Sequence, residues 1–375
     1  MSGLLKFITC GSVDDGKSTL IGHILYDSKL LYADQEKALE LDSKVGSRGG
    51  AIDYSLLLDG LMAEREQGIT IDVAYRYFTT DKRSFIVADT PGHEEYTRNM
   101  AVGASFADLA VILVDAKQGV LVQTRRHARI CALMGIKYFV FAVNKMDLVD
   151  YSEDRFKEIT AQIEELSSEL SLASVQIIPV SATEGDNVTK RSDKMNWYDG
   201  PVLLSYLEDI DVSEKKQEDG FYMPVQRVCR PDHTFRGFQG QIESGSIAVG
   251  DEVITLPSNE HAKVKSILVG DKNADSADAG RPVTIQLDKE VDVSRGCVLT
   301  TVELPVSKKF TATILWMDDQ ELTVGKDYLV KIGTETIPGI LKNIQYKIDV
   351  NTGEYIPVGR LRKNEIAVCD LVLQE

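Results

Sequence analysis

The sequence predicts an α/β domain, in which helices flank a mostly parallel sheet, followed by two β-barrel domains. Three observations support this order. Apolar runs alternate with helical patterns up to residue 207, a charged segment at 208–220 has almost no large apolar side chain, and short strands broken by Gly, Pro and Asp follow it. We therefore expect domains at 1–207, 221–304 and 305–375, joined first by a linker at 208–220.

Composition narrows the class of protein. The 375 residues are 43% hydrophobic and 27% charged, as in soluble globular proteins. We find no apolar run of the roughly 18–20 residues that a membrane helix needs, and no signal peptide, so we expect a cytoplasmic protein. The five cysteines form no C-x-x-C pair, which favours small buried side chains over a zinc site. A net charge of −16 argues against a nucleic-acid partner.

The first domain contains six apolar runs and two clear amphipathic stretches. Several runs are continuously rich in Val and Ile, which is typical of strands covered on both faces by helices. The helical stretches are 16–27 and 152–170, and the strand candidates are 4–10, 71–78, 83–89, 109–116, 137–144 and 175–182.

A phosphate-binding loop is predicted where the first strand meets the first helix. Gly11 and Gly16 let the backbone turn tightly, so that its N–H groups and the helix N-terminus face an anion. Lys17 would reach the β- and γ-phosphates, Ser18 would bind Mg²⁺, and Thr19 completes the motif. Alone, the pattern also fits an ordinary glycine-rich turn.

The segment Asp89–His93, "DTPGH", directly follows an apolar strand. Ligands bind at the carboxyl edge of a parallel sheet, so Asp89 is expected beside the phosphate loop, holding Mg²⁺ through a water. Gly92 would offer its N–H to the γ-phosphate, and His93 would orient the attacking water. An isolated histidine would more often be an ordinary surface or core residue.

Two further motifs follow the next strands. In "NKMD" we expect Asn144, Lys145 and Asp147 to bind the base, because a carboxylate can accept from guanine N1–H and its exocyclic amine. Adenine presents an acceptor at N1, so Asp147 favours GTP over ATP. In "SAT", Ser181 and Ala182 would supply a backbone N–H to guanine O6.

The γ-phosphate sensor is expected just before the second strand. Thr70, in "EREQGITID" at 64–72, is the candidate for contact with Mg²⁺ and the γ-phosphate. Its alternative is an ordinary β-branched strand residue. The connection at 28–69 is long for a compact domain, which fits a switch segment that orders around a bound nucleotide.

These residues together resemble the translation-factor class of GTPases in "GITID", "DTPGH" and "NKMD", and the downstream "FRGFQGQIESGSIAVGDEV" is similar as well. A closer resemblance is to the large subunit of bacterial sulfate adenylyltransferase, in "CGSVDDGKSTLIG" and "ADTPGHEEYTRNMAVGAS". It implies that GTP hydrolysis, with His93 placing the water, drives formation of adenosine 5′-phosphosulfate and pyrophosphate from ATP and sulfate. Adenylyl transfer would occur on a separate small subunit, in a heterodimer or larger assembly.

Two adjacent carboxylates in the phosphate loop bear on the choice between these families. Asp14 is shared with the translation factors, where it would coordinate a monovalent cation or brace a switch. Asp15 stands where they usually have His, and so favours the sulfate-activating family. The alternatives are a translation factor that binds aminoacyl-tRNA and a regulatory GTPase. The final segment, 305–375, departs from the pattern of this family, because it looks too short for a complete third barrel.

Overall fold

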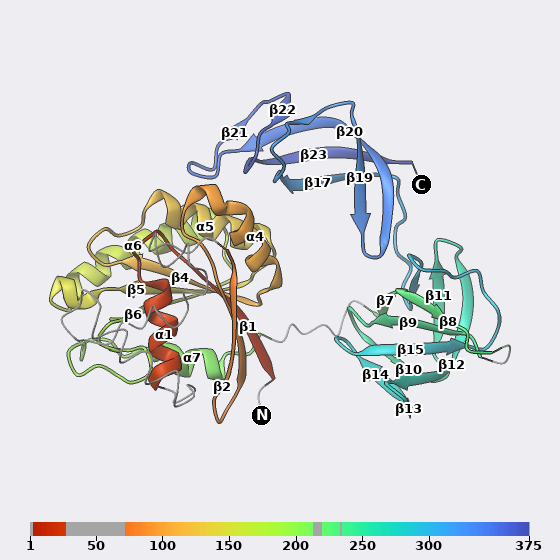
Figure 1. Cartoon of the computed structure of the whole chain (residues 1–375), viewed down its shortest axis with the longest axis horizontal. Helices are drawn as coiled ribbons and strands as arrows, with labels where there is room; N and C mark the ends of the chain where they lie inside the picture. Colours follow the sequence, from red (N-terminus) through yellow and green to blue (C-terminus); the bar gives the residue numbers. More distant parts are fainter. Residues whose placement is uncertain (1–2, 28–71, 213–219, 233–234, 375) are drawn as a thin grey trace. The chain divides into compact units, whose positions relative to one another are not determined.

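The computed structural model describes residues 3–27, 72–212, 220–232 and 235–374 (Figure 1). The chain divides into two compact units, one formed by 1–212 with 349–353 and the other by the remaining residues. Thr70 and the long connection before it lie outside the described residues, so the predicted γ-phosphate sensor stays a prediction.

The first unit is built on a six-stranded sheet with the order β2-β3-β1-β4-β5-β6. Neighbouring strands pair in parallel, except that β2 is antiparallel to β3. This confirms the predicted mostly parallel sheet. The strands are β1 (Leu4–Cys10), β2 (Ala74–Thr79), β3 (Ser84–Asp89), β4 (Leu109–Asp115), β5 (Tyr138–Asn144) and β6 (Ser174–Pro179).

Helices flank this sheet, with α4, α5 and α6 on one side and α1 and α7 on the other (Figure 1). The helix α6 begins where Ser152 accepts a hydrogen bond from the Arg155 N–H, as an N-cap residue should. The helices are α1 (Lys17–Asp27), α4 (Thr97–Phe106), α5 (Val122–Leu133), α6 (Glu153–Glu169) and α7 (Leu203–Asp209), and the short 3₁₀ turns are η2 (Glu94–Tyr96) and η3 (Met146–Val149).

The core of this unit lies on both faces of the sheet. Every residue of β4 is buried, as its unbroken apolar run predicts. On β1, Phe7 is fully buried and meets the rings of Phe78 and Phe85 edge-on, at centroid distances of 6.4 and 6.3 Å. Such contacts add to the hydrophobic stabilisation of the sheet and hold its β1–β3 side rigid.

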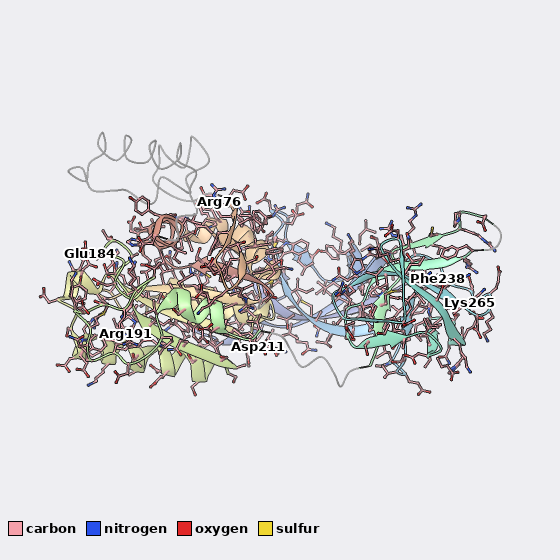
Figure 2. The ribbon with its side chains drawn as sticks, turned by 90° about the horizontal axis from the view of Figure 1, so that it is seen from below. Arg76, Glu184, Arg191, Asp211, Phe238 and Lys265 are labelled. Atoms are coloured by element: carbon pink, nitrogen blue, oxygen red, sulfur yellow. The ribbon has the colours of Figure 1, made fainter. Side chains whose placement is uncertain are left out.

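The second unit begins with an antiparallel β domain. Its largest sheet has the order β7-β16-β11-β12-β15-β9-β8, with β13 paired to β12. Phe238 on β9 is buried in the core, whereas Lys265 on β12 faces outward (Figure 2). The strands are β7 (Tyr222–Pro224), β8 (Arg227–Cys229), β9 (Gly237–Gln241), β10 (Ser246–Ala248), β11 (Glu252–Leu256), β12 (Glu260–Val269), β13 (Lys272–Ala274), β14 (Ser276–Asp278), β15 (Pro282–Leu287) and β16 (Val298–Thr300).

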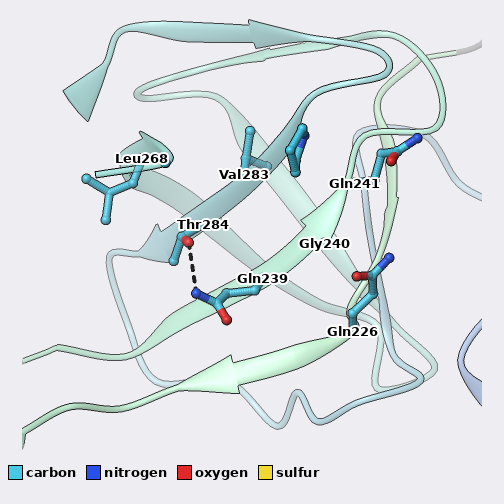
Figure 3. Close-up of a pocket in the computed structure, with 9 residues that line it drawn as sticks. Gln226, Gln239, Gly240, Gln241, Leu268, Val283 and Thr284 are labelled. Carbon is cyan, nitrogen blue, oxygen red and sulfur yellow. Dashed lines mark hydrogen bonds between the residues drawn. The ribbon is translucent and has the colours of Figure 1, made fainter. Parts of the chain in front are cut away.

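A cavity of about 300 Å³ opens on this β domain, between β9 and β15 and their neighbours (Figure 3). In its lining, Gln239 of β9 donates to the hydroxyl of Thr284, its paired neighbour on β15, at 3.2 Å. None of its lining side chains is charged, so it is poorly suited to a polyphosphate. The lining residues are Gln226, Gln239, Gly240, Gln241, Leu268, Gly270, Pro282, Val283 and Thr284.

The last segment forms a second antiparallel sheet, with the order β17-β23-β20-β19 and β21 paired to β20. Its core includes Leu341, Ile344 and Cys369. Hydrogen bonding along this path is open rather than a closed ring. The strands are β17 (Lys309–Leu315), β18 (Leu322–Thr323), β19 (Asp327–Ile332), β20 (Glu335–Ile348), β21 (Tyr355–Ile356), β22 (Arg360–Leu361) and β23 (Ile366–Leu373).

The order of elements confirms the predicted fold class, an α/β domain followed by antiparallel β-rich domains. Within the described residues, none of the helices has the length and apolar character that crossing a membrane requires.

One buried histidine makes the stability of the first unit depend on pH. His127 lies on the inner face of α5, and its Nδ1 has no hydrogen-bond partner among the described residues. Burial, together with the positive charges of Lys17 and Arg126, lowers the pKa of His127 to about 3. The unfolded chain binds a proton below pH 6.5, whereas the folded chain does not until about pH 3, so stability is lost as the pH falls.

We therefore expect His127 alone to cost the first unit about 2 kcal/mol of unfolding free energy between pH 7 and pH 5. Urea unfolding, followed by Trp197 fluorescence in a Trp316→Phe background, measures it. The His127→Gln variant should lose this part of the pH dependence, and His261→Gln, at an exposed position, should keep it. If the unfolding free energy of wild type and of His127→Gln changed equally with pH, the assignment would be contradicted.

Candidate functional site

The predicted motifs lie at one edge of the first sheet. The phosphate loop follows β1, Asp89 ends β3, Asn144 ends β5, and Ser181 comes just after β6. Because these strands run parallel to one another, their carboxyl ends meet at the same edge, where ligands bind in α/β sheets.

The loop between β1 and α1 has the backbone that phosphate binding requires. Gly16 has φ +89°, and a Cβ there would lie 2.6 Å from the Asn144 amide nitrogen, so only glycine fits. Asp14 has φ +68° and is exposed, so its carboxylate lies outside the loop. Lys17 is buried and donates from Nζ to the carbonyl oxygens of Gly11, at 3.0 Å, and Ser12, at 2.8 Å. The ammonium group is thereby held against the backbone at the start of the loop.

Burial shifts the charged groups around this loop. Desolvation lowers the pKa of Lys17, while the nearby Asp89 and Asp15 oppose the shift. Desolvation likewise raises the pKa of Asp89, and Lys17 is the strongest of the groups that oppose it. A positive and a negative group thus sit together away from water, where their fields act strongly on a bound anion or cation.

Ser18 and Asp89 form the candidate magnesium site. The Ser18 hydroxyl donates to Asp89 Oδ2 at 3.0 Å, and the Thr9 hydroxyl donates to Asp89 Oδ1 at 2.8 Å. Hydroxyl and carboxylate oxygens are the ligands that Mg²⁺ takes, so these residues fit the ion. The described residues contain no cluster of three or more His, Cys, Asp or Glu side chains arranged to bind a metal.

Gly92 and His93 follow Asp89 at the same edge. A Cβ on Gly92 would lie 2.5 Å from the Gly11 oxygen and 2.8 Å from Lys17 Nζ, so the two loops touch with no room for a side chain. His93 is exposed, and its Nδ1 accepts a hydrogen bond from the Glu95 N–H at 3.3 Å. In the neutral ring the remaining proton is then on Nε2, the nitrogen turned away from this contact.

Asn144 links the phosphate loop to the "SAT" segment. Its Nδ2 donates to the Asp15 carbonyl oxygen at 2.7 Å, and its Oδ1 accepts from the Ala182 N–H at 2.9 Å. Asp147 lies close by, where its Oδ1 accepts from the Ser181 hydroxyl at 2.6 Å. Four of the predicted base-binding residues therefore form one connected group, namely Asn144, Asp147, Ser181 and Ala182, and the Ser181 hydroxyl orients the Asp147 carboxylate.

Lys145 has a partner that sequence reasoning missed. Its Nζ donates to Asp115 Oδ2 at 2.7 Å, and Lys145 itself has φ +63°. Burial alone would raise the pKa of Asp115, but hydrogen bonds from Lys145 and from the Lys117 N–H outweigh it and lower the pKa. The position of Asp115 at the end of an apolar strand, beside the other motif strands, is the signal that could have identified it.

A second hydrogen-bonded group, which was not predicted from the sequence, supports the "SAT" segment. The Tyr151 hydroxyl donates to Asp186 at 2.9 Å, and Lys194 donates to both of them at 2.9 and 3.2 Å. Asp186 in turn accepts the Ser181 N–H through its backbone oxygen at 3.0 Å. Burial raises the pKa of Tyr151, which keeps its hydroxyl protonated as a donor. Glu184, in the loop between Ser181 and Asp186, is exposed (Figure 2).

Most of the predicted site residues are thus gathered at one edge. The structure brings together the phosphate loop, Asp89, Gly92 and the base-binding group, with the exposed His93 beside Gly92. Thr19 is buried in the first turn of α1, next to Ser18. Asp14 belongs to the loop but is turned outward, and Thr70 lies outside the described residues.

Comparison with protein families gives two matches. Residues 2–228 match the elongation factor Tu GTP binding domain, and residues 309–375 match the GTP-eEF1A C-terminal domain-like family. The first match covers the whole site described above, so this is a GTP-binding domain.

Curated relatives match almost the entire chain. Sulfate adenylyltransferase subunit 1 of Colwellia psychrerythraea is 51% identical, and that of Teredinibacter turnerae is 52% identical, each over 99% of this chain and 80% of the relative. The bifunctional enzyme CysN/CysC of Xylella fastidiosa is 52% identical over 99% of this chain and 60% of the relative.

Among solved structures, Sup35 in complex with GMPPNP is 27% identical, with a TM-score of 0.42, and covers 100% of this chain and 87% of its own. With half of its residues shared with curated relatives along 99% of its length, and with a GTP-binding domain at its start, the chain belongs to the sulfate adenylyltransferase subunit 1 family.

Proposed function

We propose that the chain is the GTP-hydrolysing subunit of a sulfate adenylyltransferase. GTP and water would give GDP and phosphate on this chain. The free energy released would drive ATP and sulfate to adenosine 5′-phosphosulfate and pyrophosphate on a partner small subunit. The translation-factor alternative has less support, because the curated relatives are named for sulfate adenylyl transfer.

The observation that carries this proposal is the Asn144 bridge. One side chain joins the loop that would hold the phosphates, through Asp15, to the segment that would contact guanine, through Ala182. Asp147, fixed by Ser181, presents a carboxylate that complements the N1–H and amino group of guanine and repels the N1 acceptor of adenine. A site selective for guanine leaves the ATP of the adenylyl transfer to another chain.

Phosphate binding would rest on Lys17, on the N–H groups of the loop at 11–16 and on those of Ser18 and Thr19. Gly92, pressed against the loop, would present its N–H to the γ-phosphate. Ser18 and Asp89 would hold Mg²⁺, with Thr70 as the further ligand proposed from sequence, and the ion would supply neutralisation of charge on the phosphates. Catalysis then consists mainly of positioning and electrostatic stabilisation.

His93 would place the attacking water in line with the γ-phosphate. Because Nδ1 accepts from the Glu95 N–H, the neutral imidazole carries its proton on Nε2 and would orient the water by donating to its oxygen. This role is orientation of the water rather than removal of its proton.

Three further assignments accompany this function. We propose a small adenylyltransferase subunit as the partner, in a heterodimer or larger assembly, and a cytoplasmic location. We also propose domain limits at 1–207, 221–304 and 305–375, with a linker at 208–220. Asp14 is exposed in the phosphate loop, and we propose for it the same two alternative roles, as a ligand of a monovalent cation or as a brace for a switch.

Reconstitution tests the proposed function. The full chain is co-purified with the small subunit from the same source, and production of adenosine 5′-phosphosulfate is measured with and without GTP. We expect GTP to raise the rate at least about tenfold, with GDP formed in proportion. GMPPNP, which is not hydrolysed, is the control. Full product formation by either chain alone, or without GTP, would contradict the division of labour.

Replacing His93 should separate hydrolysis from binding. In the reconstituted enzyme, His93→Ala should lower the kcat for GTP hydrolysis about 100-fold and change the Kd for GTP less than about threefold, because only water orientation is lost. Steady-state phosphate release and calorimetric titration measure the two quantities. His261→Ala, at an exposed position in the β domain, is the matched control. An equal loss of affinity and rate would rule out this role.

Replacing Asp147 should change base preference. Asp147→Asn should weaken GTP at least about 100-fold, because the amide nitrogen repels the donors of guanine. Xanthosine triphosphate, with an acceptor at position 2, should bind this variant better than GTP does. Asp150→Asn, at an exposed left-handed position that suits asparagine, is the control. Competition titrations measure both affinities, and an unchanged preference would be evidence against base recognition by Asp147.

A further inference from the structure

Asp15 is a buried carboxylate that the proposed mechanism does not use. It lies within the phosphate loop and is 2% exposed, in contrast to the exposed Asp14 beside it. Its Oδ2 accepts the Ser12 N–H at 2.5 Å, and its own N–H donates to the Ser12 carbonyl oxygen at 3.3 Å. The two residues are therefore joined by a reciprocal pair of hydrogen bonds that closes the loop on itself.

The carboxylate is tightly enclosed and only half satisfied. A Cβ on Gly11 would approach Asp15 Oδ2 to 3.0 Å and the Leu113 carbonyl oxygen to 3.1 Å, so the group is packed between the loop and β4. Oδ1 has no hydrogen-bond partner among the described residues. A buried carboxylate usually has both oxygens satisfied, so the burial of this one carries a cost that its single side-chain hydrogen bond only partly offsets.

The charged groups that face Asp15 come from three elements. Lys17 of α1 and Lys145 after β5 are positive, and Asp115 at the end of β4 is negative. Burial is the largest influence and raises the pKa of Asp15, and the two lysines oppose it. Lys17 is the same cation that the phosphates of a bound nucleotide would recruit, so the carboxylate and the nucleotide share one counter-charge.

We propose that Asp15 is a positioning residue that sets the nucleotide affinity of this site: its carboxylate closes the loop through Ser12, and its negative charge weakens the binding of GDP and GTP. The hydrogen bond favours binding because it pre-forms the loop, whereas the charge opposes binding because it repels the phosphates. The balance gives a loop that is ordered without holding its product tightly. This inference rests on the proposed GTPase function of the same site.

Two substitutions separate the hydrogen bond from the charge. Asp15→Asn keeps an acceptor for the Ser12 N–H and removes the charge, so its Kd for GDP should fall about tenfold, with slower GDP dissociation. Asp15→Ala removes both and should bind GDP more weakly than Asp15→Asn does. Calorimetry with GDP and stopped-flow release of a fluorescent GDP, on the full chain, measure these values. Asp209→Asn, at an exposed position, controls for net charge.

The pH profile gives a readout that a merely structural role would not move. Protonated Asp15 has the same charge as asparagine, so the ratio of the wild-type Kd to the Asp15→Asn Kd should fall toward one as the pH is lowered. Titration of GDP itself cancels in this ratio. A constant ratio, or an Asp15→Asn variant that binds GDP no more tightly than wild type, overturns the proposal.

Failure of the Asp15 proposal can be distinguished from failure of the proposed function. GDP binding without any effect on sulfate adenylylation would refute the coupling to the small subunit and leave the role of Asp15 to be decided by the variants. A wild-type chain that bound no guanine nucleotide would refute both. Thermal unfolding of each variant checks that the loop change has not unfolded the domain. Asp15→Ser also keeps an oxygen acceptor without the charge, so its Kd for GDP should be lower than that of wild type, as for Asp15→Asn.

Discussion

The site depends on one side chain, Asn144, at the end of β5 in the first sheet. Its amide donates to the phosphate loop and accepts from the segment after β6, and so fixes the spacing between the two. A carboxylate could not donate and a hydroxyl is too short, so an amide is the group that satisfies both backbone atoms. Because this bond uses the Asp15 carbonyl oxygen, the same link reaches the residue whose charge we propose to weaken nucleotide binding. The residues that we propose to bind the phosphates and the base are therefore joined in a single hydrogen-bonded unit.

Around this link the protein keeps several charges away from water. Lys17, Asp89 and Asp15 are all buried within one loop and its neighbouring strand end, and the pKa of each is shifted toward the neutral form by burial. Such a site is costly for the empty protein, since each charge has lost hydration. For Lys17 and Asp89 this cost falls when a polyphosphate and its cation bring charges of opposite sign. Binding energy is thereby tied to ligand charge, which suits a protein whose substrate and product differ by one phosphate.

The residues that sequence could identify are those whose chemistry is tied to a strand end. Lys17, Asp89 and Asp147 each follow an apolar run, so a parallel sheet is enough to bring them together. The Asn144 contacts could not be foreseen, because they join backbone atoms 129 and 38 residues away. The Asp115–Lys145 pair depends in the same way on the order of strands. The helices α4, α5 and α7 had no clear apolar period, since the arginines of α5 and the small residues of α4 obscure it. The edge strand β2 starts later than predicted, at Ala74.

The contact between Gly92 and the phosphate loop has a mechanical consequence. Two backbones that meet with no space for a methyl group form a hard stop, because compressing them further meets steep van der Waals repulsion. Neither segment can advance toward the other, so any rearrangement after Asp89 must proceed by rotation of the peptide or by retreat. The direction of movement is thus restricted before any nucleotide arrives. We therefore expect this segment to move away from the phosphate loop, and not toward it, when a phosphate is lost.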